Sequence, residues 1–484
     1  MKRRDFLRTV GTGAAAMALG PGGLHAVDKS SKPNILFIFA DDQTYESICA
    51  LGYDEVQTPN LDKLVKGGVT FTHAYNQGSW SGAVCIASRC MLNTGRFLWH
   101  AQKVHGSAEK ERAAGRFWSE YMKTAGYKTY MTGKWHVKAN PNKAFDVCKD
   151  PRPGMPKQTR QGYNRPIEGK KDLWSPYDTK FGGFWAGGKH WSEVVGDHGV
   201  SFLKQASKSD DPFFMYLAFN APHDPRQSPK EYVDKYPLDK VKVPKNFLPE
   251  YPYKDAIGCS KGLRDEKLAP FPRTKYSIKV NRQEYYAIIT HMDAQIGRIL
   301  DALKKSGKSD NTYIFFTADH GLSVGHHGLV GKQNLFDHSV RVPLMVTGPG
   351  IAAGKTFDTP VYLQDIMPST LEIAGVPKPD HVEFRSLMPI ISGKRPSSYD
   401  AIYGGYLSVQ RMVTMDGYKL LLYPKCKKAL LFDLKKDPDE MVDLAGKPQS
   451  KPIIRKLLAR LLELQASTGD KLNIKRVFGE LLEL

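Results

Sequence analysis

Long apolar segments and closely spaced cysteine pairs are both missing from this 484-residue chain. The one apolar run near the N-terminus has about ten residues, whereas a bilayer-spanning helix needs roughly 20. The six cysteines are scattered and include no Cys-x-x-Cys pair, so their spacing predicts no disulfide framework. No internal repeat, zinc-finger spacing or RNP-like string is present either. These absences argue against a membrane span, a disulfide-stapled fold, a repeat array and the common nucleic-acid-binding motifs.

The first 26 residues predict an export signal that is not part of the fold. Lys2-Arg3-Arg4-Asp5-Phe6-Leu7-Arg8 is a twin-arginine start, and an apolar stretch follows it from Val10 to Leu19. Leu24-His25-Ala26 offers a cleavage point before Val27. We therefore expect the twin-arginine translocase to export the folded protein to the periplasm or the medium. A basic N-terminal arm or a membrane anchor is the alternative, and the short apolar run disfavours the anchor.

Basic residues outnumber acidic ones, and the formal net charge is +20. The signal segment 1–26 carries +3 of this, which leaves +17 for a mature chain that begins at Val27. A field of this sign raises the local concentration of anionic ligands. A sulfated polyanion fits better than nucleic acid because the nucleic-acid motifs are missing, although charge alone does not separate the two.

Four apolar runs predict strands buried on both faces of a parallel sheet: 34–40, 212–219, 312–318 and 342–346. Segment 127–133 is predicted as a further strand, which leads into Lys134. Helical patterns alternate with them, the longest from 282 to 305. This alternation predicts a doubly wound, mostly parallel α/β sheet in a catalytic domain over 27–385. Two irregular segments, 139–189 and 228–279, are predicted as long functional loops.

The pattern changes after about residue 385. Segments 411–415, 418–423 and 429–433 read as antiparallel strands, with a hairpin turn at Asp416-Gly417. A helix is predicted at 452–465. Residues 386–484 are therefore predicted to form a smaller C-terminal α+β subdomain.

Charged pairs follow two of the predicted strands. Asp41 and Asp42 follow the strand 34–40, and Asp319 and His320 follow the strand 312–318. Open α/β sheets bind ligands at the carboxyl ends of their strands. One Asp-Asp pair alone is more often a helix cap beside a solvated carboxylate. Two such pairs at two strand ends instead favour a cation between the carboxylates.

A second group of reactive residues lies in the segment 79–96. Cys85, Ser88 and Arg89 fall within five residues, behind a small-residue loop that leads to a helix N-terminus. Free N–H groups and the helix dipole at such a position favour an anion and lower a thiol pKa. Further along the chain, Lys134 and His136 are two residues apart and project to the same face of an extended backbone.

Cys85-x-Ala87-x-Arg89, followed by Thr94-Gly95-Arg96, resembles the signature of the type I sulfatases of the alkaline-phosphatase-like superfamily. Asn93 stands where the family usually has Leu. Gly133-Lys134-Trp135-His136, Pro222-His223-Asp224-Pro225 and Gly331-Lys332 are similar to further family elements and occur in the family order. The resemblance covers about 34–346.

The resemblance implies a modified nucleophile and a metal. A maturase would convert Cys85 to formylglycine, whose hydrate attacks sulfur. Asp41, Asp42, Asp319 and His320, beside residue 85, would hold one divalent metal, usually Ca²⁺ in this family. Three carboxylates suit a hard cation and favour Ca²⁺ over Zn²⁺, whereas His320 is a softer ligand than the alternative Asn.

The remaining implied roles concern the sulfate group. Lys134 and Lys332 would bind sulfate oxygens, and Arg89 would hold the modified residue. His136 would hydrogen-bond the formylglycine hydrate, and His223 would protonate the departing alkoxide.

The expected substrate is a sulfated glycan or oligosaccharide, with Asp224, Arg226 and His338 as candidate sugar contacts. Choline sulfate and aryl sulfates are smaller alternatives. A phosphoester or phosphonate-ester hydrolase of the same superfamily is a second interpretation; it would favour a Ser or Thr nucleophile and a second metal site. A non-catalytic basic glycan-binding protein is the third, against which the complete set of nucleophile, acid and ligands argues.

Overall fold

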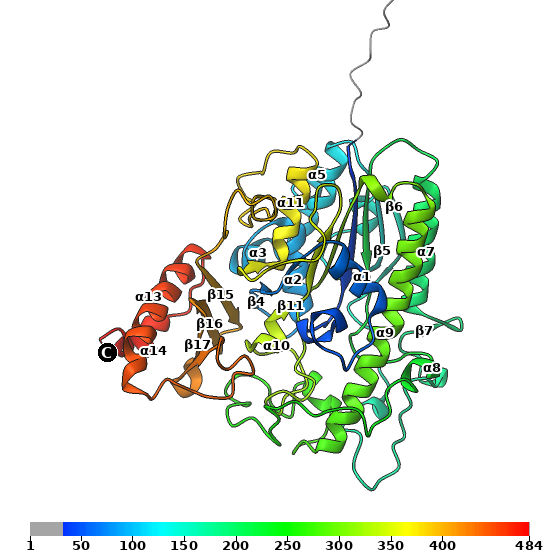
Figure 1. The fold of residues 1–484 in the computed structure, drawn as a ribbon. Helices are drawn as coiled ribbons and strands as arrows, with labels where there is room; N and C mark the ends of the chain where they lie inside the picture. Colours follow the sequence, from blue (N-terminus) through cyan, green and yellow to red (C-terminus); the bar gives the residue numbers. More distant parts are fainter. Residues whose placement is uncertain (1–31, 484) are drawn as a thin grey trace, which may run out of the picture. The chain divides into compact units, whose positions relative to one another are not determined.

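The computed structural model describes residues 32–483, so the predicted signal segment 1–26 lies outside the described residues. From Pro33 onward the chain forms one unit around an eight-stranded sheet of order β13–β2–β12–β10–β1–β9–β5–β6 (Figure 1). Its strands are β1 (Asn34–Ala40), β2 (Val69–Phe71), β5 (Lys128–Lys134), β6 (Val147–Arg152), β9 (Phe213–Ala218), β10 (Thr312–Ala318), β12 (Leu344–Thr347) and β13 (Lys355–Phe357).

The centre of this sheet is parallel, as predicted. β1 pairs in parallel with both β10 and β9, and β9 pairs in parallel with β5. Only β12 breaks the pattern, because it runs antiparallel to β10 and β2. All seven residues of β1 are buried, which explains its unbroken apolar sequence: helices cover both faces of the strand.

Helices α1, α7 and α9 lie on one side of the large sheet, and α2, α5 and α11 lie on the other (Figure 1). The helices are α1 (Pro59–Gly67), α2 (Val84–Thr94), α3 (Leu98–His105), α4 (Ala108–Ala113), α5 (Trp118–Thr124), α6 (Pro141–Ala144), α7 (Trp191–Ala206), α8 (Lys230–Val233), α9 (Lys275–Lys305), α10 (Asp337–Val340), α11 (Ile366–Ile373), α12 (Met388–Ile391), α13 (Lys451–Ser467) and α14 (Ile474–Phe478). α9 begins earlier than predicted because Thr274 and Ser277 form a capping box ahead of it. Between residues 32 and 483, no helix is long and apolar enough to cross a bilayer.

One segment predicted as loop contributes a strand. β6 lies inside 139–189 and pairs in parallel with β5 at the edge of the sheet. Its side chains are half-buried or exposed, so it lacks the apolar run that marks the central strands. The same segment also contains the β7 (Trp185–Ala186) and β8 (Lys189–His190) hairpin. A third small sheet joins β3 (Ala74–Tyr75), β11 (Arg341–Val342) and β14 (Val361–Tyr362).

The C-terminal region forms a five-stranded sheet of order β18–β17–β16–β15–β4, packed against α13. Its strands are β15 (Ala401–Tyr406), β16 (Gln410–Met415), β17 (Tyr418–Tyr423), β18 (Lys428–Asp433) and the short β4 (Gly78–Ser79). The three antiparallel strands predicted here are present, whereas β15 was not anticipated. β4 comes from the N-terminal part of the chain and leads directly into α2, so the C-terminal sheet and the helix of Cys85 are connected through one strand.

α2 is held by apolar contacts on both sides. Leu92 belongs to the core of the large sheet, whereas Val84, Ala87 and Cys90 belong to the core under the C-terminal sheet. Ten of its eleven residues are buried. This packing fixes the first turn of the helix, where Cys85 lies.

Candidate active site

The two charged pairs lie side by side at the carboxyl edge of the large sheet. Ala40 and Ala318 are partners in the parallel pairing of β1 with β10, so the residues that follow them leave the sheet together. The backbone N–H of Asp42 donates to Asp319 Oδ1 at 3.2 Å, and His320 Nε2 lies 3.1 Å from Asp42 Oδ1. Asp41, Asp42, Asp319 and His320 are each at most 1% exposed.

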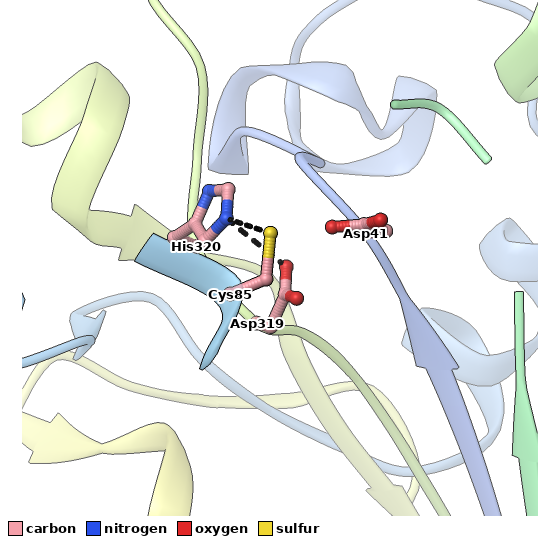
Figure 2. Close-up of side chains that lie close together, drawn as sticks. All are labelled: Asp41, Cys85, Asp319 and His320. Atoms are coloured by element: carbon pink, nitrogen blue, oxygen red, sulfur yellow. Dashed lines mark hydrogen bonds and ion pairs between the residues drawn. The ribbon is translucent and has the colours of Figure 1, made fainter. Parts of the chain in front are cut away.

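Cys85 points from the first turn of α2 into this group (Figure 2). Its sulfur lies 3.4 Å from His320 Nε2 and 3.7 Å from the Lys332 amine. Burial alone would raise the pKa of the Cys85 thiol, but the charges of Lys134, Lys332 and His320 outweigh it and hold that pKa well below its usual range. Cys90, one turn further along the helix, shows the opposite: burial raises its pKa to about 12.

Three cations surround the carboxylates. The Lys134 amine, at the end of β5, pairs with Asp41, and the Lys332 amine lies 2.8 Å and 2.9 Å from the two carboxylate oxygens of Asp42. Arg89 Nε donates to Asp319 Oδ2 at 2.9 Å, and its Nη1 donates to the carbonyl of Lys134 at 2.7 Å. Each carboxylate therefore has its own cation in a site closed to bulk water.

His136 follows β5 in a left-handed backbone conformation, with φ of 55°. Its ring hydrogen-bonds the Cys85 sulfur, and burial lowers its pKa. Gly154 packs directly against that ring, because a Cβ added there would come within 2.3 Å of it. The ring of His136 therefore fits here only because residue 154, just after the end of β6, has no side chain.

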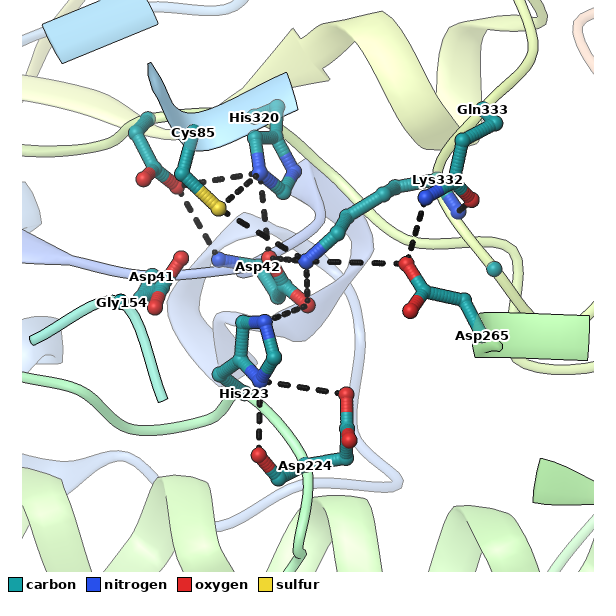
Figure 3. Close-up of polar contacts among 12 residues, drawn as sticks. Asp41, Asp42, Cys85, Gly154, His223, Asp224, Asp265, His320, Lys332 and Gln333 are labelled. Atoms are coloured by element: carbon teal, nitrogen blue, oxygen red, sulfur yellow. Dashed lines mark hydrogen bonds and ion pairs between the residues drawn. The ribbon is translucent and has the colours of Figure 1, made fainter. Parts of the chain in front are cut away.

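His223 approaches the carboxylates from the loop after β9 (Figure 3). Its Nε2 lies 3.9 Å from Asp42 Oδ2, and its Nδ1 lies 2.7 Å from the Asp224 carbonyl oxygen and 3.1 Å from Asp224 Oδ1. Burial lowers the pKa of His223, but the neighbouring Asp42 and Asp224 outweigh it and raise that pKa to about 10. The imidazole is therefore protonated at neutral pH and has a proton to give.

Residues that the sequence patterns did not reveal support this set. Arg264 forms ion pairs with Asp224 and Asp265, and Asp265 Oδ2 lies 3.8 Å from the Lys332 amine (Figure 3). Gln333 bridges Asp265 and the carbonyl of Gly82, in the loop just before Cys85. These residues lie in or contact the irregular segment 228–279, which has no periodicity, so no local signal marks them.

The two other candidate sugar contacts occupy different surroundings. Arg226 is buried behind Asp42: its Nη1 donates to Asn281 Oδ1 at 2.8 Å, and its guanidinium lies over the ring of Tyr285, whose hydroxyl donates to the Asp42 carbonyl. His338 lies elsewhere, with its Nε2 3.3 Å from His327 Nδ1 and its ring stacked on His326. The structure thus brings Asp224 and Arg226 to the carboxylate group and places His338 in a separate histidine cluster.

The carboxylate group has the donor atoms that a divalent cation needs. One ligand atom each from Asp41, Cys85, Asp319 and His320 lies within 4.8 Å of the other three (Figure 2). Asp41 Oδ1 is buried and has no hydrogen-bond partner, which leaves one carboxylate oxygen available for a ligand. Three carboxylates together with one imidazole fit a hard cation better than a soft one.

Comparisons with known proteins identify the family. A family model described as sulfatase matches residues 33–376, and a model described as the C-terminal region of N-sulphoglucosamine sulphohydrolase matches residues 325–467. An arylsulfatase of Clostridium perfringens is 30% identical over 479 residues, which cover 89% of this chain and 95% of that protein.

Two solved structures share the fold. One, described as a complex with its substrate D-glucosamine-2-N,6-O-disulfate, has a TM-score of 0.70, 23% identity and coverage of 91% of this chain and 99% of the other. A phosphonate monoester hydrolase of Agrobacterium radiobacter has a TM-score of 0.70, 21% identity and coverage of 90% and 96%. The fold alone therefore does not separate sulfate from phosphonate esters, whereas the family model and the arylsulfatase do. The chain belongs to the sulfatase family, the enzymes that hydrolyse sulfate esters.

Proposed function

We propose that this sulfatase removes O-sulfate groups from a sulfated carbohydrate, with residue 85 as the nucleophile after conversion of Cys85 to formylglycine. The observation that carries the proposal is the convergence of Cys85, His223, Lys134 and Lys332 on three buried carboxylates. A thiol beside two amines and an imidazole acid matches the demands of sulfate transfer better than those of a structural core.

Formylglycine at position 85 would supply, as its hydrate, the oxygen that attacks sulfur. The chain's own residues prepare the attack. His136 contacts the side chain of residue 85 and is held by Gly154, so it orients the attacking group. Arg89, buried and tied to Asp319, keeps the first turn of α2 against the strand ends.

Lys134 and Lys332 are the groups proposed to bind the sulfate oxygens. Both amines are buried, and Lys332 lies within 3.7 Å of the Cys85 sulfur, so an ester group seated over residue 85 would lie beside their positive charge. Fixed charges in a site closed to water stabilise the charge that develops during transfer without reorganising solvent. As the bond from sulfur to the sugar oxygen breaks, protonated His223 gives its proton to that oxygen, and the sugar leaves as an alcohol.

A divalent cation, proposed to be Ca²⁺, would be held by Asp41, Asp42, Asp319 and His320 and would supply further positive charge beside the sulfate oxygens. Calcium titration by calorimetry tests this assignment without reference to activity. We expect wild-type protein to bind one Ca²⁺ and Asp41→Asn to bind it at least tenfold more weakly. Equal affinities, or a preference for Zn²⁺, would contradict it.

The carbohydrate assignment rests on two supports. The net charge of +20 favours polyanionic substrates, and relatives with saccharide names match this chain at its C-terminal region and over its fold. Asp224 and Arg226 are proposed to contact the sugar, as is His338, although the last lies in the histidine cluster described above. We also propose export through the twin-arginine signal in residues 1–26.

A desulfation screen tests the proposal. Protein co-expressed with a maturase is assayed on defined sulfated mono- and disaccharides, choline sulfate, an aryl sulfate and a phosphate monoester, with Cys85→Ala as the matched control. We expect the highest kcat/KM on a sulfated saccharide and none above background for the control. A higher kcat/KM on the phosphate ester would reject the assignment of sulfate esters as substrates. A higher kcat/KM on choline sulfate would reject the assignment of a carbohydrate substrate.

A further inference from the structure

A second pocket, of about 730 Å³, opens beside the loop that leads into α2. We propose that it binds another sulfated sugar of the same glycan chain, which makes the protein selective for oligosaccharides over single sugars; this rests on the proposed function. We call it the lysine pocket and define it by Trp80, Lys103, Arg411, Lys425, Asp470 and Lys471. Its volume lies within the range of roughly 300–1,000 Å³ that is typical of small-ligand sites.

The charge of the lysine pocket is strongly positive. Asp470 is already neutralised, because Arg411 donates to both of its carboxylate oxygens, at 2.6 Å and 2.9 Å. Lys103, Lys425 and Lys471 are exposed, and none of them has an ion-pair partner among residues 32–483. Three unpaired amines around one hollow leave a site for a multiply charged anion.

Two other lysines of the C-terminal region have carboxylate partners. Lys428 pairs with Asp443 at 2.9 Å, and Lys456 pairs with Asp416 at 2.7 Å. The three lysines of the lysine pocket come from three separate segments and share no such partner. The segments are α3, the turn between β17 and β18, and the connection between α13 and α14.

Trp80 connects the lysine pocket to the candidate active site. It lies five residues before Cys85 and lines the pocket, and its ring centroid is 5.6 Å from that of His105. Burial and the charges of Lys138 and His136 lower the pKa of His105. A half-buried indole offers the apolar surface on which the C–H face of a sugar ring packs.

On this proposal, two parts of one ligand bind at the two ends of the loop from Trp80 to Cys85. A sulfate ester over residue 85 is hydrolysed, while a neighbouring sugar packs on Trp80 and its sulfate groups pair with the three lysines. The pocket takes no part in the chemistry, so a single sulfated sugar would gain nothing from it.

Binding measurements in a Cys85→Ala background, in which the ligand is not turned over, test the inference. The pocket variant carries Lys103→Gln, Lys425→Gln and Lys471→Gln. The control carries Lys208→Gln, Lys304→Gln and Lys305→Gln, which removes the same charge. These lysines precede β9 and β10, so they lie toward the amino ends of these strands, away from the carboxyl ends that carry the candidate active site. The probes are a heparin-derived octasaccharide, a carrageenan-derived hexasaccharide and a sulfated monosaccharide.

We expect the pocket variant to raise the Kd of at least one oligosaccharide about 10- to 100-fold, since three exposed charge contacts are lost together. The control should change that Kd less than twofold, and neither variant should alter monosaccharide binding. In addition, the Kd for the oligosaccharide should depend less steeply on salt concentration in the pocket variant, and only in that variant.

Equal effects of the two variants on both oligosaccharides would overturn the inference, because the loss would then reflect net charge alone. A single-stranded DNA of matched charge serves as a further probe. If the pocket variant raises the Kd of this DNA as much as that of the oligosaccharide, the inference is also overturned, because the pocket would then select anions rather than saccharides. Sulfate release is measured separately on maturase-treated wild-type protein, so a failure of the proposed function appears there and leaves the binding result to be judged alone.

Discussion

Two buried ionic clusters in this protein use nearly the same residue types but differ in how their hydrogen-bonding capacity is used. We call Asp41, Asp42, Asp319, Lys134, Lys332 and Arg89 the strand-edge cluster, and Asp337, Arg341, Lys419 and Glu440 the junction cluster. The junction cluster joins α10 to β17 of the C-terminal sheet. Both are almost completely shielded from solvent.

The junction cluster is paired within itself. The Lys419 amine donates to Asp337 Oδ1 at 2.5 Å and to the carbonyl of Leu335 at 3.3 Å, and it forms an ion pair with Glu440 Oε1 at 2.8 Å. Glu440 Oε2 also accepts from the Asp337 backbone. Such a cluster holds two elements together and has no thiol or imidazole among its four charged side chains.

The strand-edge cluster is open. Asp41 Oδ1 and Arg89 Nη2 are buried without hydrogen-bond partners, and a thiol and two imidazoles lie among the charges. Unsatisfied buried polar groups cost free energy, and those that lie beside reactive groups are available to a ligand. The comparison teaches that burial of charge alone does not mark a site; unused donors and acceptors beside reactive groups do.

The largest expected effect follows the loss of the proposed nucleophile, Cys85, beside the strand-edge cluster. Cys85→Ala should lower kcat/KM for a sulfated saccharide by about 10⁵-fold or more, since no other side chain replaces covalent attack. Cys426→Ala, which changes an exposed thiol, serves as the control and should be unaffected. Sulfate release by ion chromatography measures both, and retention of a tenth of wild-type activity in Cys85→Ala would reject the role.

The second largest effect is expected at His223, the proposed proton donor. His223→Gln should lower kcat/KM for a sulfated saccharide about 10³-fold, within the usual range for general acid catalysis. The loss should be much smaller for nitrophenyl sulfate, because a phenolate leaves without protonation. His198→Gln, at an exposed histidine paired with Asp150, is the matched control. Equal losses on the two substrates would show that His223 binds sulfate rather than donating a proton.

A substitution in the junction cluster should lower the stability of the fold and should not affect catalysis directly. Lys419→Met leaves the buried Asp337 and Glu440 without their cation, so the free energy of unfolding should fall by about 3 kcal/mol. Lys428→Met breaks a partly exposed pair and should cost less than about 1 kcal/mol. Urea unfolding measures both. If Lys419→Met left the stability normal but abolished activity, the claim that the junction cluster has only a structural role would be wrong.

The smallest effect is expected at the support of the acid. Arg264 pairs with Asp224, which contacts His223, and with Asp265, which lies near Lys332. Arg264→Met should therefore lower kcat/KM about tenfold and leave thermal stability nearly unchanged, because the arginine is 35% exposed. Arg298→Met, at an exposed pair with Asp197, should change neither quantity. A loss of stability that explains the lost activity would make Arg264 purely structural.

Much of the fold and the centre of the site could be predicted from sequence because both depend on local patterns. The apolar runs of β1, β9 and β10 mark strands buried on two faces, and parallel pairing then brings Asp41 and Asp319 to one edge. The half-exposed β6 and the glycine-containing β15 lack such a pattern and were missed. Arg264 and Asp265 lie in an irregular segment and reach the site through ion pairs with residues distant in the sequence. Such pairs produce no periodic pattern or motif, so the sequence did not predict them.

The most direct test of the account measures sulfate release against the fraction of residue 85 that carries formylglycine. Samples co-expressed with graded amounts of maturase provide the range, and mass spectrometry of the tryptic peptide 67–89 gives the fraction, because conversion replaces one sulfur and two hydrogens with one oxygen. The account predicts that kcat rises in proportion to this fraction and extrapolates to zero for unmodified protein. Full activity from a sample in which residue 85 is entirely cysteine would contradict it.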